Sequence, residues 1–208
     1  MIDMGFLITA FVTLFVIIDP IGLTPMFVAL TQGTPARERR GIALRACLTG
    51  FAILAVFTLF GEAVLGFVGI SMAAFRVAGG ALLFLTALDM LFERRAQRRE
   101  DQAAERPDPS IFPLSIPLIA GPGAIATVIL LAGQKPSVAG LSSVIGVVAA
   151  VLIVVLLFFL AAGLLERALG KTGINVTTRL LGMLLAALSV QFILDGLSAY
   201  GSTVGFAR

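Results

Sequence analysis

Six apolar stretches, separated by short polar segments, make up most of the chain. They cover about residues 5–30, 41–61, 71–92, 111–133, 141–165 and 176–199. Each is close to or above the roughly 20 residues that an α-helix needs to cross about 30 Å of hydrocarbon. The pattern predicts an all-α membrane protein with six transmembrane helices, forming a single integral membrane domain over residues 1–208.

Composition supports a membrane location and excludes several kinds of chemistry. Of the 208 residues, 59% are hydrophobic and 13% are charged, and a soluble domain of this size cannot bury that much apolar side chain. The chain has no histidine and a single cysteine, Cys47, which argues against a disulfide framework and a metal site. We expect the lipid bilayer as a partner, and no metal or cofactor.

The basic residues predict an orientation. Twelve of the 15 Lys and Arg residues fall in the first, third and fifth loops or the adjoining helix ends. By the positive-inside rule, these loops face the cytoplasm and both termini the periplasm of a bacterial inner membrane. This distribution explains the net charge of +3 without a nucleic-acid partner. The N-terminus lacks a basic region and a cleavage site, so we interpret it as the start of a helix.

The two halves of the chain share a series of residues in the same order. Glu62-Ala-Val-Leu-Gly-Phe-Val-Gly-Ile70 matches Glu166-Arg-Ala-Leu-Gly-Lys-Thr-Gly-Ile174 at five positions, and Arg76-x-x-Gly79 matches Arg179-x-x-Gly182. The similarity predicts two repeats, one over residues 1–92 and the other over 111–199, joined by a cytoplasmic linker over 93–110. Three spans in each half make the repeats inverted, as in many secondary transporters.

The first and fourth spans are interrupted near their middle. Asp19-Pro20 divides the first span and Gly121-Pro122-Gly123 divides the fourth, with Pro117 just before it. Proline lacks an amide hydrogen and disfavours helix at the preceding residue. We therefore expect two broken helices that restart near the membrane midplane, with Asp19 or Gly121 as N-cap and Pro20 or Pro122 as the first helical residue.

Two interpretations of these breaks stay open. They either shape helix packing as proline kinks or line a solute site, because irregular backbone at this depth is tolerated where it is buried or faces a cavity. We favour a site because the two breaks occupy matching positions and one carries a carboxylate. The candidate binding residues are Asp19, Pro20, Gly22, Thr24, Gly121, Pro122, Gly123, Thr127 and Gln191.

Four charged residues near helix ends form a separate group. Glu62, Arg76, Glu166 and Arg179 occupy matching places in the two repeats. They are candidates for gating ion pairs, or for structural and interfacial roles in which arginine side chains reach the membrane surface. We favour the structural and interfacial roles over gating ion pairs.

At the level of motifs the chain resembles the MarC family of inner-membrane proteins. The resemblance is carried by Asp19-Pro-Ile-Gly22 followed by Pro25, by Ile116-Pro-Leu-Ile-Ala-Gly-Pro-Gly-Ala-Ile125, and by Arg179-x-x-Gly182 with Gln191 downstream. The family is similar in build to six-helix amino-acid exporters of the LysE type. The resemblance implies a secondary transporter of small neutral amino acids such as glycine or alanine, with proton coupling left open.

A model of solute binding follows from this implication. Free amides at Gly121–Gly123 would hold the carboxylate of an amino acid, and Asp19 would hold its ammonium group or a co-transported proton. The alternatives are a channel or a membrane assembly factor that does not transport. An intramembrane enzyme is disfavoured because no catalytic motif is present. The partners expected are a small-molecule solute and lipid, and a homo-oligomer stays open.

Overall fold

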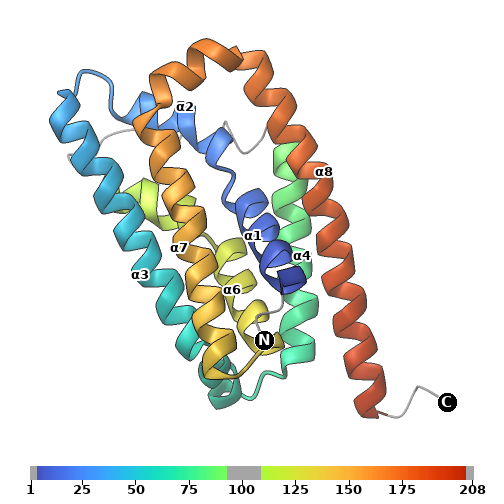
Figure 1. The fold of residues 1–208 in the computed structure, drawn as a ribbon. Coiled ribbons are helices and arrows are strands. Elements are labelled where there is room, and N and C mark those ends of the chain that lie inside the picture. The colour runs from blue at the N-terminus through green and yellow to red at the C-terminus, as the bar shows by residue number, and fades with distance from the viewer. Residues whose placement is uncertain (1–3, 93–108, 205–208) are drawn as a thin grey trace.

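The computed structural model describes residues 4–92 and 109–204, and within them the chain forms helices and no strands (Figure 1). The predicted all-α class is thereby confirmed. Most of the predicted linker and the side chain of Glu166 lie outside the described residues. The elements are α1 (Met4–Ile18), α2 (Pro20–Leu30), α3 (Ala36–Val68), α4 (Met72–Leu91), the wide π-type coil η1 (Ser110–Ile119), α6 (Pro122–Gln134), α7 (Val138–Leu160) and α8 (Ala162–Val204).

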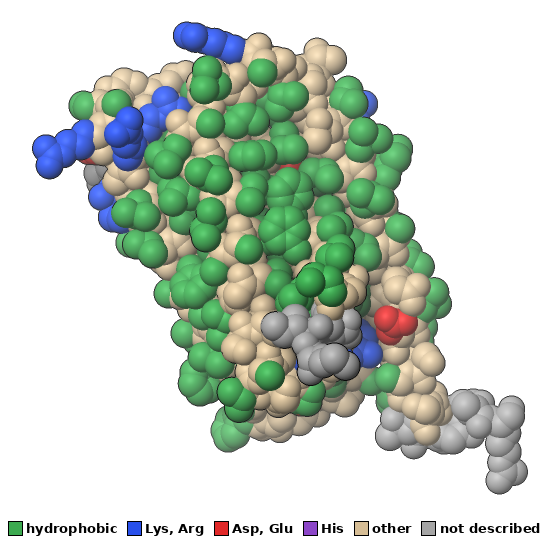
Figure 2. Space-filling model, in the orientation of Figure 1, with side chains coloured by type: hydrophobic (Ala, Val, Ile, Leu, Met, Phe, Trp, Pro, Cys, Tyr) green, Lys and Arg blue, Asp and Glu red, His purple; other side chains and the backbone are tan. Residues whose placement is uncertain are grey.

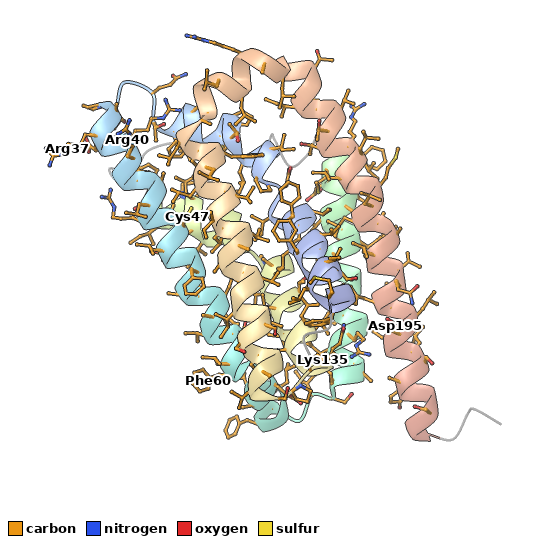
Figure 3. All side chains as sticks on the ribbon, viewed as in Figure 1. Arg37, Arg40, Cys47, Phe60, Lys135 and Asp195 are labelled. Carbon is orange, nitrogen blue, oxygen red and sulfur yellow. The ribbon has the colours of Figure 1, made fainter. Side chains whose placement is uncertain are left out.

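The helices have the length and apolar surface of membrane spans. Five stretches qualify, with α1 and α2 together as one, and a sixth is formed by η1 and α6, which meet at an angle of 54°. Large apolar side chains cover much of the face of the bundle that Figure 2 shows. Among the exposed apolar residues, Phe67 is 94% exposed. Such a surface requires lipid contact. Arg37 and Arg40 lie at one end of the bundle, and Lys135 and Asp195 at the other (Figure 3).

Helices α4 and α8 pack closely because small residues recur along both. Gly80 lies against Ser189, Gly182 against Ala87, and Gly196 against Ala73, in each case with the glycine facing a backbone carbonyl oxygen. These residues are seven apart on each helix, which is two turns. Small side chains at this spacing let two membrane helices approach over their length.

Several contacts between the two halves are reciprocal. Helix α3 packs against η1 and α6 of the second half, and α7 packs against α1 and α2 of the first. Helix α4 contacts α6, and its counterpart α8 contacts α2. Each of these contacts has a counterpart when the two halves are exchanged, whereas the contacts of α1 with α6 and α8 are not matched by contacts of η1 of similar size. This is the packing expected of an internal repeat, although the inverted relation of the halves stays a prediction.

Two spans differ from the sequence expectation. The predicted interruption near Lys171 is present, but it is a kink at Gly170, where φ is 59° and ψ is 175°, between two helical segments of α8 and not a longer loop. The positive φ suits a residue without a side chain. In the fourth span, the segment before Gly121 is the irregular coil η1 and not a regular half-helix.

Candidate functional site

The first helix break is centred on Asp19. This residue has left-handed backbone angles, φ 56° and ψ 66°, and it caps α2, which begins at Pro20. Its Oδ1 accepts a hydrogen bond of 3.0 Å from the amide of Gly22, and its carbonyl oxygen accepts one of 2.9 Å from the amide of Leu23. The predicted N-cap and the predicted first helical residue are therefore confirmed. Asp19 is fully buried, which places a carboxylate inside the bundle.

Gly22 makes this cap geometry possible. A Cβ added at residue 22 would overlap Oδ2 of Asp19 and would lie 2.8 Å from its Cγ. The carboxylate therefore folds back over the start of α2 only because residue 22 has no side chain. The glycine in Asp19-Pro-Ile-Gly22 is explained by this contact within the protein, without a ligand.

The second break is preceded by a segment in which prolines prevent regular helix. Phe112 and Ile116, the residues before Pro113 and Pro117, have extended backbone angles, as expected for residues that precede proline. The peptide bonds before both prolines are cis. The oxygen of the buried Ser115 hydroxyl lies 2.8 Å from the carbonyl oxygens of Ala46 on α3 and of Ser110, and its single proton is donated to one or shared between the two. This hydroxyl fastens η1 to α3.

Helix α6 restarts at Pro122 with Gly121 as its N-cap, as predicted. Gly121 and Gly123 are buried, whereas Pro122 is exposed. A Cβ added at Gly121 would overlap the carbonyl oxygen of Pro117, so the turn itself requires glycine. At the start of α6, the backbone of the two glycines is therefore buried inside the bundle, whereas the ring of Pro122 is exposed on its surface.

Gly123 brings the two breaks together. A Cβ added here would lie 3.4 Å from Ile17, which is two residues before Asp19. It would also lie 3.2 Å from Leu83 and 3.7 Å from the hydroxyl oxygen of Thr86, both on α4. The start of α6 thus packs against the end of α1, and α4 closes the junction. Figure 1 shows α2 and α6 leaving the middle of the bundle in opposite directions.

Two predicted hydroxyl residues follow the breaks. Thr24 and Thr127 are buried, and each donates a hydrogen bond to its own helix, Thr24 to the carbonyl oxygen of Pro20 at 2.9 Å and Thr127 to that of Gly123 at 2.8 Å. These bonds satisfy the hydroxyl donors in this conformation and leave oxygen lone pairs as acceptors.

Other predicted residues lie away from the breaks. Gln191 is exposed on α8, and its amide nitrogen donates a 2.7 Å hydrogen bond to Asp195 one turn later. Glu62 on α3 and Arg179 on α8 are exposed, and Arg76 is half-buried near the start of α4. The structure does not bring Gln191 to the junction of the breaks. The side chain of Glu166, the remaining gating candidate, lies outside the described residues.

Sequence reasoning missed Leu83 and Thr86 at this junction, and Ser115 in the coil that precedes it. Leu83 and Thr86 cover Gly123, but nothing in the pattern of α4 shows which of its faces meets α6. Ser115 carries a usable signal, since it lies between two prolines. Proline has no N–H, so some backbone carbonyl oxygens in this segment lack the amide donor that a regular helix would supply. A nearby serine hydroxyl can donate to such an oxygen and hold the coil in one conformation.

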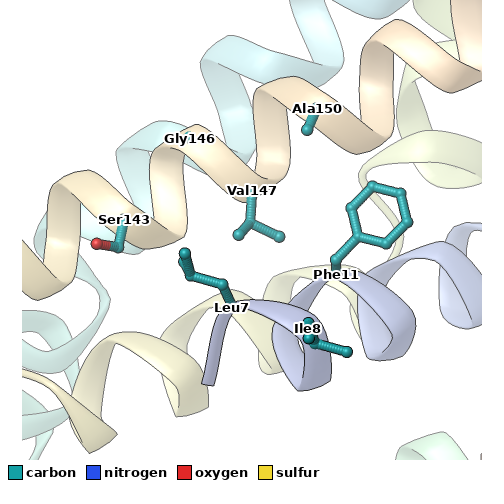
Figure 4. Close-up of a pocket in the computed structure, with 7 residues that line it drawn as sticks. All are labelled: Leu7, Ile8, Phe11, Ser143, Gly146, Val147 and Ala150. Atoms are coloured by element: carbon teal, nitrogen blue, oxygen red, sulfur yellow. The ribbon is translucent and has the colours of Figure 1, made fainter. Parts of the chain in front are cut away.

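The larger of two described pockets lies elsewhere. It is a groove of about 480 Å³ between α1 and α7, and its lining in Figure 4 is apolar apart from Ser143. The Ser143 hydroxyl donates to the carbonyl oxygen of Ala139 at 2.7 Å. A groove without a charged lining residue does not suit a zwitterionic solute, since an amino acid needs partners for two charges.

Comparison with known proteins places the chain in a family. The family described as "MarC family integral membrane protein" matches residues 4–200. UPF0056 membrane protein YvbG of Bacillus subtilis is 38% identical over 199 residues, covering 93% of this chain and 94% of the relative. UPF0056 membrane protein MJ1677 of Methanocaldococcus jannaschii is 37% identical, covering 94% and 97%. UPF0056 inner membrane protein YhgN of Escherichia coli is 34% identical, covering 93% and 97%. No solved structure matches the chain.

Proposed function

Because the chain belongs to the MarC family of integral membrane proteins, we propose that it is a secondary transporter of small neutral amino acids. Glycine and alanine are the expected solutes, and the junction between Asp19-Pro20 and Gly121–Gly123 is the expected site. The observation that carries the proposal is the fully buried carboxylate of Asp19 at the break of a membrane-spanning helix. A carboxylate at the bilayer centre costs about 2.5–3.5 kcal/mol on insertion scales, and intramembrane carboxylates commonly mark solute or ion pathways.

Two features of the breaks support binding of a zwitterion. Asp19 supplies negative charge for an ammonium group, and a carboxylate accepts up to about four hydrogen bonds, so capping Gly22 does not exclude a further contact. The N-terminus of α6 supplies backbone amides and a positive dipole end for a carboxylate. The contact between Gly123 and Ile17 supports placing the two groups at one site.

The same packing argues for a small solute. Leu83, Ile17 and Thr86 already fill the space beside Gly123. A solute enters this junction only if the surrounding helices separate, and a small side chain requires the least separation. The complete burial of Asp19 fits a conformation closed to both sides. The reciprocal packing of the two halves supports an opening that alternates between the two membrane faces.

Flux through liposomes that contain the purified protein tests the proposal. Uptake of labelled glycine and alanine should saturate with concentration, and internal unlabelled alanine should accelerate uptake of external label. Leucine and glutamate should be poor solutes. Repeating the measurement with and without a pH gradient tests proton coupling.

The alternatives give different results in the same experiment. A channel would give flux that does not saturate and shows no acceleration by internal solute. An assembly factor would give no flux above protein-free liposomes. Either result would reject the transporter proposal.

A further inference from the structure

The second described pocket lies where helices α2, α3 and α7 meet. Its volume is about 160 Å³, which far exceeds the roughly 10–15 Å³ needed for one ordered water. It is lined by Phe27 on α2, by Ala36, Arg39 and Arg40 on α3, by Phe159 and Leu160 on α7, and by Gly163 at the start of α8. This pocket has no residue in common with the proposed transport site.

Two aromatic rings and a guanidinium group form the wall of the pocket. The rings of Phe27 and Phe159 stack with their centroids 4.4 Å apart and an angle of 8° between planes. The guanidinium carbon of Arg39 lies 5.1 Å from the centre of the Phe27 ring. Since Phe27 and Phe159 are both buried, the stack holds the guanidinium group of Arg39 at the pocket through a cation–π contact.

The positive charge of this pocket is not balanced by its own lining. No acidic residue is among the seven lining residues. The Nη2 atom of Arg39 is covered and has no hydrogen-bond partner within residues 4–92 and 109–204. Arg40 lines the same pocket and is exposed. A covered guanidinium donor without an acceptor is unfavourable, and an anion in the pocket would reduce that cost.

We propose that this pocket binds a phosphate group, supplied by the headgroup of an anionic phospholipid. Arginine guanidinium groups match phosphate oxygens in geometry and charge. The pocket lies at the end of the spans, since α3 begins at Ala36 and α7 ends at Leu160. Leu160 is 51% exposed beside it, so an acyl chain bound to the same phosphate would meet an apolar surface. Free phosphate shares the headgroup chemistry but gains nothing from this surface.

Thermal unfolding of the purified full-length protein tests the site without measuring transport. Cys47 is the sole cysteine and is buried, so a maleimide dye that fluoresces on reaction reports its exposure on unfolding. Short-chain phosphatidylglycerol should raise the midpoint by about 3 °C. Inorganic phosphate at the same concentration, and the matching diacylglycerol without phosphate, should each have little effect.

Three variants distinguish binding at the pocket from a nonspecific effect of positive charge on α3. Arg39→Gln and Arg40→Gln should each reduce the shift, because each removes a lining charge. Arg37→Gln removes an exposed charge from the same helix turn outside the pocket lining, and it should keep the wild-type shift. If Arg39→Gln fails to fold, Arg40→Gln alone still tests the site. Native mass spectrometry should also find less bound phosphatidylglycerol on the pocket variants than on Arg37→Gln.

The outcomes are distinct. Equal shifts in the wild type and all three variants, or no shift in the wild type, would overturn the site. An equal shift with inorganic phosphate that is lost in the pocket variants would overturn the lipid as the source and support a site for free phosphate. Stabilisation by diacylglycerol alone would overturn phosphate recognition.

Discussion

The carboxylate of Asp19 lies over the backbone of Gly22 and accepts its amide hydrogen at 3.0 Å. This relationship couples the only buried acidic residue of the described chain to the start of α2. Asp19 therefore has two properties that mutation can test separately. One is the ability to cap a helix, and the other is the negative charge inside the membrane.

Asp19→Asn removes the charge and keeps the cap. Asparagine caps helices about as well as aspartate, so the unfolding midpoint should stay close to that of the wild type. Transport of alanine should fall by about ten- to a hundredfold, because a hydrogen bond to a charged group contributes about 1.5–3 kcal/mol. The measurement is initial flux in liposomes over a range of pH. Asp195→Asn, which alters a carboxylate on α8, should transport normally, and wild-type flux in Asp19→Asn would mean that Asp19 is a helix cap alone.

Gly22→Ala tests the cap geometry. The added Cβ would overlap the Asp19 carboxylate, so the side chain must leave its position and the Gly22 amide loses its acceptor. Loss of an N-cap costs about 1–2 kcal/mol, and the unfolding midpoint should fall accordingly in the Cys47 dye assay. Gly66→Ala is the matched control, since nothing lies within 4 Å of a Cβ added there. Equal stability of the two variants would contradict the described contact.

Gly80→Val tests the close packing of α4 and α8. A Cβ at residue 80 would lie 2.8 Å from the carbonyl oxygen of Ser189 and 2.7 Å from Ile193. Backbone atoms cannot move aside easily, so overpacking should destabilise the protein by about 1–3 kcal/mol. Gly146→Val adds the same side chain to α7 where a Cβ meets nothing within 4 Å. We expect a clearly lower yield of folded protein and a lower midpoint for Gly80→Val than for Gly146→Val.

The orientation in the membrane is a further prediction. A periplasm-dependent reporter fused after Arg208 should be active, and the same reporter inserted between residues 93 and 108 should be inactive. A cytoplasm-dependent reporter should give the reverse pattern. The reason is the clustering of basic residues in alternate loops. The opposite activities would reverse the assigned orientation and would place the phosphate pocket in the outer leaflet.

Local chemistry made the breaks predictable from the sequence. Pro20 and Pro122 lack amide hydrogens and begin helices readily, so the positions of both restarts followed from single residues. The coil before Gly121 was only partly foreseen, although Pro113 and Pro117 act on their preceding residues by the same rule. Its order depends on the hydrogen bond from Ser115 to Ala46, a contact between residues far apart in the chain.

Contacts between distant helices limited prediction of the site. The sequence does not show which face of α8 turns inward, and Gln191 lies on an exposed one. The pocket around Arg39 combines residues from four helices, and only the folded arrangement brings them together. The sequence predicts that Gly123 offers its amide to a solute, but it does not predict that Ile17, Leu83 and Thr86 pack beside this glycine.

Helix α2 connects the two proposed sites, because Asp19 caps its start and the ring of Phe27, three residues before its end, packs against Phe159 and Arg39. Its 11 residues span about 16 Å, and the part from the Asp19 cap to Phe27, whose ring lies under Arg39, covers about 12 Å. Pro25 lies between the two sites and leaves one backbone hydrogen bond of α2 unmade, so α2 carries a movement from one site to the other to the extent that the helix does not bend there. If solute and phospholipid favour different positions of α2, their binding is thermodynamically linked, and each changes the affinity for the other by the same factor. The lipid composition of the membrane would act as an allosteric effector of transport.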